Sequence, residues 1–331
     1  MTSTPRYGTS AEVIQMAGTL CGDDDFSESL RRDGAGPWVT EPQRATAAAA
    51  GRGCCLPRHG STLVKVDTGT PHLARVWNYW LGGKDYFPVD REAGDQLREA
   101  CPVVVGAARD VRDFVGRAVA WLAAGEGVRQ FLDVGGGLPM VGETHQVAQR
   151  VAAGSRVVYV ESGRVAPARV RELLGSGPDG ATRYVEGGFR DPAAILRAAA
   201  PALDLGRPVA FMLLGLAGTL GHGQEVSYVI RRLMGAAVPG SYLVLAEGSA
   251  ASPSMAAAAG QYAATGARIY YLRDRQQLRQ LFDGLELVPP GVVPTPDWHP
   301  ARPSAASGAH GGDDGKAEAY SHCGVGRKPS S

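Results

Sequence analysis

The sequence predicts an α/β fold in which a doubly wound, mostly parallel sheet is covered by helices on both faces. From Arg129 onward, short apolar stretches alternate with amphipathic stretches of helical period. Two of the apolar stretches, 157–160 and 209–214, are unbroken, which is typical of strands buried on both faces. A third stretch ends at Val134 and leads directly into residues 135–137, all glycine, where a strand of such a sheet would turn into its helix.

The elements of this sheet are expected in a regular order. The expected strands cover residues 129–134, 156–161, 182–186, 208–214, 241–246 and about 284–288. The expected helices cover about 142–153, 164–174, 192–199, 223–236, 253–264 and 274–282. Asp274 with Gln277 three residues later is a capping-box signal and marks the start of the last helix.

Three further helices are expected before the first strand. They cover about 71–81, 89–100 and 103–124, and the first begins at Pro71 and ends before Gly82. These helices predict a helical cap over residues 63–127, in front of an α/β domain over 128–300; caps over α/β sheets commonly close active sites. The flanks have no sustained hydrophobic period, so we predict a disordered extension over 1–62 and a disordered tail over 301–331.

Composition excludes several classes of function. The net charge of the 331-residue chain is +1, so no overall field favours nucleic acid or an anionic membrane. No apolar run approaches a transmembrane span, and the N-terminus lacks the layout of a signal peptide. The five cysteines form no metal-ligand spacing. We therefore expect a cytoplasmic protein without a metal site, a nucleic-acid partner or a membrane partner.

The glycine turn is the clearest candidate for a ligand site. Glycine permits positive φ and lets a ligand lie against the backbone. A nicotinamide dinucleotide fingerprint would place a third glycine where Met140 stands, so the pattern that remains is the D-x-G-x-G of S-adenosylmethionine enzymes, formed by Asp133, Gly135 and Gly137. Asp133 is expected to order the turn or to reach polar groups of the ligand. A tight turn without a ligand is the alternative.

Glu161 is the second candidate, because it ends the second expected strand after the glycine turn. An acid at that place accepts hydrogen bonds from both ribose hydroxyls of a nucleoside ligand. The alternative is a solvated acid at a strand end; the position after the glycine turn favours the ribose role. His145 and His222 are interpreted as packing or solvated histidines rather than general bases.

These motifs together resemble an actinobacterial family of S-adenosylmethionine-dependent methyltransferases, formerly catalogued as a domain of unknown function. The matching segments are residues 74–87 with 90–92, 129–139, 184–185 with 190–192, 239–245 and 282–294. The resemblance covers about residues 67–300. It implies a class I methyltransferase fold, in which a seven-stranded sheet carries helices on both faces and an N-terminal helical cap.

The chain also departs from the pattern of that family. After the second strand the family has Asp-Asn-Asp-Pro, where this chain has residues 161–164, Glu-Ser-Gly-Arg. Gly188 stands where the family has an acid that would meet the adenine amino group, and residues 217–219, Ala-Gly-Thr, replace Leu-His-Phe. Smaller changes are Gly136 and Met140 for threonines and Asn78 for an aspartate. Several lost hydrogen bonds, each of about 1–3 kcal/mol, would weaken cofactor binding strongly.

Two readings follow. In the first, the protein is a methyltransferase that uses S-adenosylmethionine and acts on an unidentified acceptor, expected to be a small molecule. In the second, it is a degenerate member that binds a ligand or a partner without catalysis. Survival of the glycine turn and the cap motif favours the enzyme. The resemblance assigns four residues of the sheet to the cofactor: Asp133, Gly135, Gly137 and Glu161. It also assigns residues of the cap, which would contact either the cofactor or the acceptor: Arg75, Asn78, Gly83 and Lys84, with neighbouring Asp85.

Overall fold

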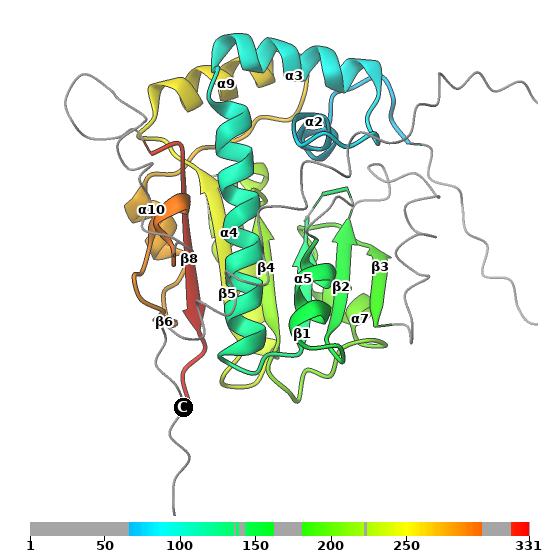
Figure 1. Cartoon of the computed structure of the whole chain (residues 1–331), viewed down its shortest axis with the longest axis vertical. Helices are drawn as coiled ribbons and strands as arrows, with labels where there is room; N and C mark the ends of the chain where they lie inside the picture. Colours follow the sequence, from blue (N-terminus) through cyan, green and yellow to red (C-terminus); the bar gives the residue numbers. More distant parts are fainter. Residues whose placement is uncertain are drawn as a thin grey trace, which may run out of the picture.

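The computed structural model describes residues 66–135, 137–138, 143–161, 181–221, 224–299 and 319–330. They form a mixed eight-stranded sheet in the order β3-β2-β1-β4-β5-β8-β6, with the short β7 paired to β8 (Figure 1). The strands are β1 Gln130–Val134, β2 Arg156–Glu161, β3 Thr182–Glu186, β4 Ala210–Leu214, β5 Tyr242–Gly248, β6 Glu286–Leu287, β7 Val293–Pro294 and β8 Ser321–Arg327. The first five strands are parallel, as the sequence predicts, and seven strands follow one another across the sheet.

Strand order reverses between β1 and β4. From β1 the chain moves outward through β2 to β3 and then returns to the other side of β1 with β4 and β5. The carboxyl ends of β1 and β4 therefore border a crevice, which is the usual ligand site of an open α/β sheet. Gly135 directly follows β1, so the predicted glycine turn lies at this crevice.

Helices cover both faces of the sheet and separate its core into two halves. α4 (Val104–Ala124) and α5 (Thr144–Val151) cover one face, where Phe131 of β1 is buried. α7 (Pro192–Ala199), α8 (Gln224–Ala236) and α10 (Arg275–Gln280) cover the other, where Leu132 is buried. This alternation is the pleat of a strand buried on both faces. The predicted capping box is confirmed, since Gln277 N donates to Asp274 Oδ1 over 2.7 Å.

The cap is built differently from the prediction. α2 (Leu73–Trp80) and α3 (Pro88–Ala100) pack against α9 (Pro253–Ala264), a helix that follows β5, and all three lie above the carboxyl ends of the parallel strands (Figure 1). α4 belongs to both parts: Val104 and Ala108 lie in the cap core, whereas Val119 and Leu122 lie in the sheet core. The expected boundary at residue 127 is therefore wrong as a packing boundary, because one continuous helix joins cap and sheet.

The prediction of a disordered tail is wrong for residues 321–327. They form β8, which pairs with β5 on one side and β6 on the other. The sequence does not predict this strand, because it contains Gly324 and Gly326 and glycine weakens an isolated strand. In the folded protein their missing side chains make room for Phe282: a Cβ added at Gly326 would lie 2.7 Å from Phe282 Cδ1.

Three other predicted segments lie outside the described residues. At the flanks these are the expected disordered extension over 1–62 and the tail over 301–318, and within the α/β domain it is the helix expected over 164–174. Within the described ranges, no helix combines the length and the apolar character that crossing a bilayer requires.

Candidate functional site

A cavity opens at the crevice between the carboxyl ends of β1 and β4, and α2 of the cap forms its roof. Its walls come from the glycine turn, the ends of β2 and β4, the segment after β3, and one side of α4. The lining residues are His72, Leu73, Ala74, Trp77, Leu81, Val111, Arg112, Val115, Gly135, Gly137, Leu138, Glu161, Phe189, Leu214, Gly215, Leu216 and Thr219. Three of the sequence-predicted site residues, Gly135, Gly137 and Glu161, therefore meet in one place.

The glycine turn requires glycine for two separate reasons. Gly135 and Gly137 have φ values of 73° and 89°, a region that side-chain-bearing residues rarely adopt. A Cβ added at Gly135 would also lie 3.0 Å from Leu216 Cδ1. The turn is anchored to the neighbouring strand, because Gly135 N donates to the carbonyl of Val160 over 2.9 Å. The backbone at the cavity wall is thus held close and free of side chains.

Glu161 is connected directly to this turn. It ends β2 with 2% of its surface exposed, and its Oε1 accepts a hydrogen bond of 2.9 Å from Gly137 N. The solvated-acid alternative is excluded by this burial, and the arrangement places a fixed acceptor beside an exposed backbone.

Apolar side chains line the same cavity as Glu161. Phe189 follows β3, and Leu214 and Leu216 come from the end of β4. They form flat, water-excluding walls suited to an aromatic base. Beside Phe189, a Cβ added at Gly188 would meet no atom within 4 Å. The acid expected at Gly188 from the resemblance is therefore absent, and space remains where it would stand.

Arg112 supplies the cavity with a positive charge that sequence reasoning missed. Its Nη2 donates to Glu143 Oε1 over 2.6 Å, while its buried Nε has no hydrogen-bond partner in the described part of the chain. Burial alone would lower the pKa of Arg112, but the nearby Glu143 and Asp133 outweigh it, so the pKa is raised. In sequence, Arg112 lies beside the apolar stripe of α4, and only the position of that helix turns it toward the cavity.

Asp133 lies away from the cavity. Its Oδ2 accepts a hydrogen bond of 2.7 Å from Thr144 Oγ1, at the first turn of α5. Burial raises the pKa of Asp133 to about 7. The side chain thus supports the helix behind the turn. His145 behaves as interpreted, since its ring packs against Tyr159 and lines no part of this cavity; His222 lies outside the described residues.

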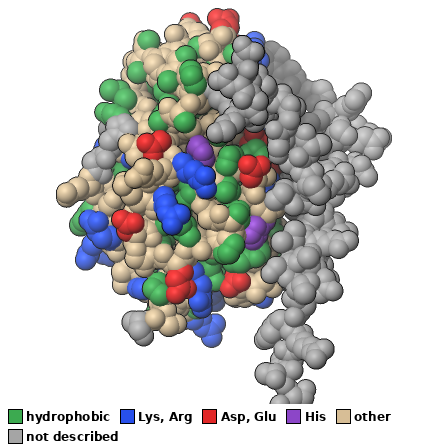
Figure 2. Space-filling view, turned by 90° about the vertical axis from the view of Figure 1, so that its left-hand side faces the viewer, with side chains coloured by type: hydrophobic (Ala, Val, Ile, Leu, Met, Phe, Trp, Pro, Cys, Tyr) green, Lys and Arg blue, Asp and Glu red, His purple; other side chains and the backbone are tan. Residues whose placement is uncertain are grey.

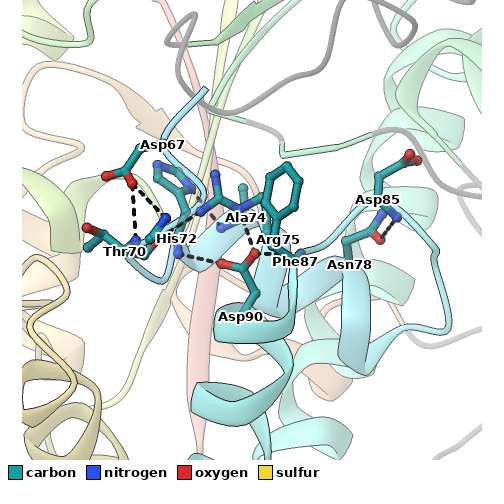
Figure 3. Close-up of polar contacts among 10 residues, drawn as sticks. Asp67, Thr70, His72, Ala74, Arg75, Asn78, Asp85, Phe87 and Asp90 are labelled. Carbon is teal, nitrogen blue, oxygen red and sulfur yellow. Dashed lines mark hydrogen bonds and ion pairs between the residues drawn. The ribbon is translucent and has the colours of Figure 1, made fainter. Parts of the chain in front are cut away.

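Arg75 forms the centre of a buried clamp inside the cap (Figure 3). Its Nε donates to Asp90 Oδ2 over 2.7 Å, and the two side chains are 1% and 0% exposed. Its Nη2 donates to the carbonyl of Thr70 over 2.8 Å. Asp90 also accepts from the backbone of His72 and of Phe87, over 2.8 and 2.9 Å. Three segments of the cap are joined at this carboxylate, and Arg75 does not line the cavity.

The remaining cap candidates form the turn that follows α2. Asn78 Oδ1 accepts a hydrogen bond of 2.9 Å from Asp85 N (Figure 3). Gly83 leaves room for this contact, because a Cβ added there would overlap the Asn78 amide. Lys84 is exposed at the surface. None of these residues lines the cavity, so the structure assigns Asn78 and Gly83 to shaping the turn.

The order β3-β2-β1-β4-β5 followed by an antiparallel β8 before β6, with a glycine turn facing the acid of β2, defines a class I methyltransferase fold. The chain belongs to the family described as S-adenosyl methyltransferase, whose model matches residues 60–329. Its cofactor is S-adenosylmethionine. The family and the cofactor predicted from the sequence are thereby confirmed.

Two solved structures from actinobacteria are similar over nearly the whole of their own length. A DUF574 family protein from Streptomyces avermitilis MA-4680 is 38% identical, with a TM-score of 0.72, and the match covers 80% of this chain and 100% of that one. A structure from Thermobifida fusca YX is 33% identical, with a TM-score of 0.72, and covers 79% of this chain and 96% of that one. No curated protein matches the chain.

Proposed function

We propose that this protein is an active S-adenosylmethionine-dependent methyltransferase whose acceptor is a small molecule. The observation that supports the proposal is the contact between Gly137 N and Glu161 Oε1, 2.9 Å, at the wall of a cavity roofed by the cap. It joins an exposed backbone turn to a buried carboxylate, which are the two features that a nucleoside with an amino-acid tail requires.

The residues present fit the cofactor. Glu161 would accept hydrogen bonds from the ribose hydroxyls, and the backbone at Gly135 and Gly137 would lie against the chain of the ligand. Phe189 and Leu216 would enclose the adenine ring. Arg112, which lines the cavity, would attract the carboxylate of the methionine part. The bound cofactor supplies a methyl group activated by a sulfonium.

The protein itself mainly has to align the reactants and exclude water. Methyl transfer from a sulfonium to a nucleophile needs an in-line approach, and alignment can supply a large part of the rate enhancement without a fixed base. α2 contributes Leu73 and Trp77 to the roof of the cavity, and these apolar side chains keep water from the reacting groups. We therefore assign no general base in the described part of the chain.

The distribution of charge on the protein surface is also consistent with a small acceptor. The net charge is +1, and acidic and basic side chains are interspersed on the face shown in Figure 2. Nucleic-acid sites usually present a continuous basic surface, and that face does not. The charge pattern therefore favours a small acceptor over nucleic acid.

The second candidate is a degenerate family member that binds a ligand without catalysis. The open space at Gly188 supports it, since one expected contact to the adenine amino group is absent. Calorimetric titration of the full chain with S-adenosylmethionine and S-adenosylhomocysteine separates the two. We expect micromolar binding of both. Absence of binding at millimolar concentration would overturn the enzyme proposal and leave the cavity as a remnant of the cofactor site.

A further inference from the structure

A second cavity lies next to the cofactor cavity, on the side of α9. The two share part of their lining, namely Leu73 and Trp77 of α2, Val111 of α4, and Gly215 after β4. Because Gly215 has no side chain, the wall between the cavities is thin at the end of β4. A molecule in the second cavity would therefore be a neighbour of a molecule in the first.

The second cavity is apolar and is built mainly by the cap. Trp77, Trp80 and Tyr262 supply aromatic surface, while Ala108 and Ala258 leave space between the helices. All five residues are at least half-buried; four of them belong to the apolar core of the cap, and Trp77 packs against it. Aromatic side chains with small residues between them are suited to a planar apolar ligand.

Glu247 is the only charged side chain that lines this cavity in the described part of the chain, and three donors of the protein already contact its carboxylate. Its Oε1 accepts from Ala217 N over 2.8 Å, and its Oε2 accepts from Gly218 N over 3.0 Å and from Tyr270 Oη over 2.6 Å. The carboxylate thus holds the turn after β4 to β5. It is 2% exposed and is directed into protein contacts.

The Tyr270 hydroxyl is committed to the same contact. Burial and the adjacent Glu247 raise the pKa of Tyr270 well above its usual value, so the hydroxyl keeps its proton. The Tyr270 ring occupies the place that a side chain at Gly218 would take. A ligand that carried a full charge into this cavity would lose its water shell and find no free counter-charge among these groups.

From these contacts we infer that the second cavity is the acceptor site and that its ligand is an uncharged, planar, largely apolar molecule with a neutral nucleophilic oxygen or nitrogen. The inference rests on the proposed function, because it assumes that the methyl donor is bound in the first cavity. In the reaction, this oxygen or nitrogen forms a bond to the methyl carbon as the bond from that carbon to sulfur breaks. The sulfonium becomes a neutral thioether, and the methylated product gives up its extra proton to solvent when it leaves the site.

The test uses 2-naphthol as an uncharged probe and 2-naphthoate as its anionic counterpart, each titrated calorimetrically into the full chain. We expect 2-naphthol to bind in the micromolar range and 2-naphthoate at least tenfold more weakly. Equal or tighter binding of the carboxylate, or no binding of 2-naphthol, would overturn the proposed ligand class.

A pair of variants on α9 locates the site. Ala259 lines the second cavity, whereas Ala257 is exposed on the same helix. Ala259→Phe should weaken 2-naphthol binding at least tenfold and leave the S-adenosylmethionine titration unchanged, and Ala257→Phe should change neither. Unchanged 2-naphthol binding by Ala259→Phe would place the probe elsewhere and overturn the assignment. If the unaltered protein bound 2-naphthol but did not bind S-adenosylmethionine, this result would contradict only the proposed function.

Discussion

The turn after β1 and the turn after α2 both depend on glycine, yet only the glycines of the first turn line the cavity. In the first, Gly135 and Gly137 leave backbone at the wall beside Glu161. In the second, the missing side chain of Gly83 makes room for the Asn78 amide of the protein itself. A glycine can therefore serve a ligand or serve the packing of the chain, and the neighbouring atoms decide which.

The acids of the two regions differ in the same way. Asp90 accepts hydrogen bonds from Arg75, His72 N and Phe87 N, all within the cap, and is fully buried. Glu161 accepts from Gly137 and also lines the cavity. A buried carboxylate whose surroundings lie within one part of the protein mainly stabilises the fold, whereas one that also lines a cavity can contact a ligand there. Four predictions test this contrast: three substitutions, ordered by expected effect, and then a dependence of stability on pH.

Asp90→Ala should cause the largest loss of stability. Removing this carboxylate leaves the Arg75 guanidinium buried without its partner, which typically costs about 3–5 kcal/mol of unfolding free energy. Urea denaturation measures the change. The control is Glu286→Ala, whose ion pair with Arg327 is exposed at 3.6 Å and is worth at most about 1 kcal/mol. Unchanged stability with lost cofactor binding would restore the ligand role first expected for Arg75.

Glu161→Ala should act mainly on binding. The loss of an acceptor for the ribose is expected to weaken S-adenosylmethionine by about tenfold or more, while the melting temperature changes little. Calorimetric titration measures the affinity. Glu186 is the matched control, because it ends β3 directly opposite Glu161 and is exposed. Equal affinities for Glu161→Ala and the unaltered protein would remove Glu161 from the cofactor site.

Gly188→Asp should increase the affinity of the protein for S-adenosylhomocysteine. The position has open space for a Cβ, and the new carboxylate could accept a hydrogen bond from the adenine amino group. We expect S-adenosylhomocysteine to bind up to about tenfold more tightly. S-inosylhomocysteine, which lacks the amino group, is the control ligand and should not gain. A gain for both ligands would mean that the carboxylate acts on something other than the amino group.

His72 belongs to both regions, since its backbone contacts Asp90 and its side chain lines the cavity. Burial, followed by the charge of Arg75, lowers the pKa of His72 from 6.5 to about 4. As pH falls from 6.5 toward 4, the unfolded chain binds a proton that the folded chain resists, so stability should decrease, by at most about 3 kcal/mol. Protonation would also remove the Nδ1 acceptor that caps α2 through Ala74 N.

His72→Asn checks this prediction, because asparagine keeps a side-chain cap and does not titrate. Urea denaturation at pH 7 and at pH 4.5 should show a smaller loss of stability in the variant than in the unaltered protein. The same loss in both proteins would assign the acid sensitivity to other groups.

Part of the cofactor site could be predicted from the sequence because its signals are local. Gly135 and Gly137 follow an apolar strand within a few residues, and Glu161 ends the next strand, so the rules of a parallel sheet place them together. Arg112, Phe189 and Leu216 carry no comparable local pattern. Their approach to the cavity depends on how α4 and the loops after β3 and β4 cross the sheet.

The parallel strands β1 to β5, the glycine turn and the family were determined by the sequence alone, since periodicity and short motifs act within one element and its neighbours. The tertiary structure decided what depends on distant partners. β8 is a strand because β5 and β6 flank it and Phe282 fills the space over its glycines. α9 joins the cap because its apolar residues meet α3 across the fold. Such contacts are specified by packing in three dimensions, which no local pattern records.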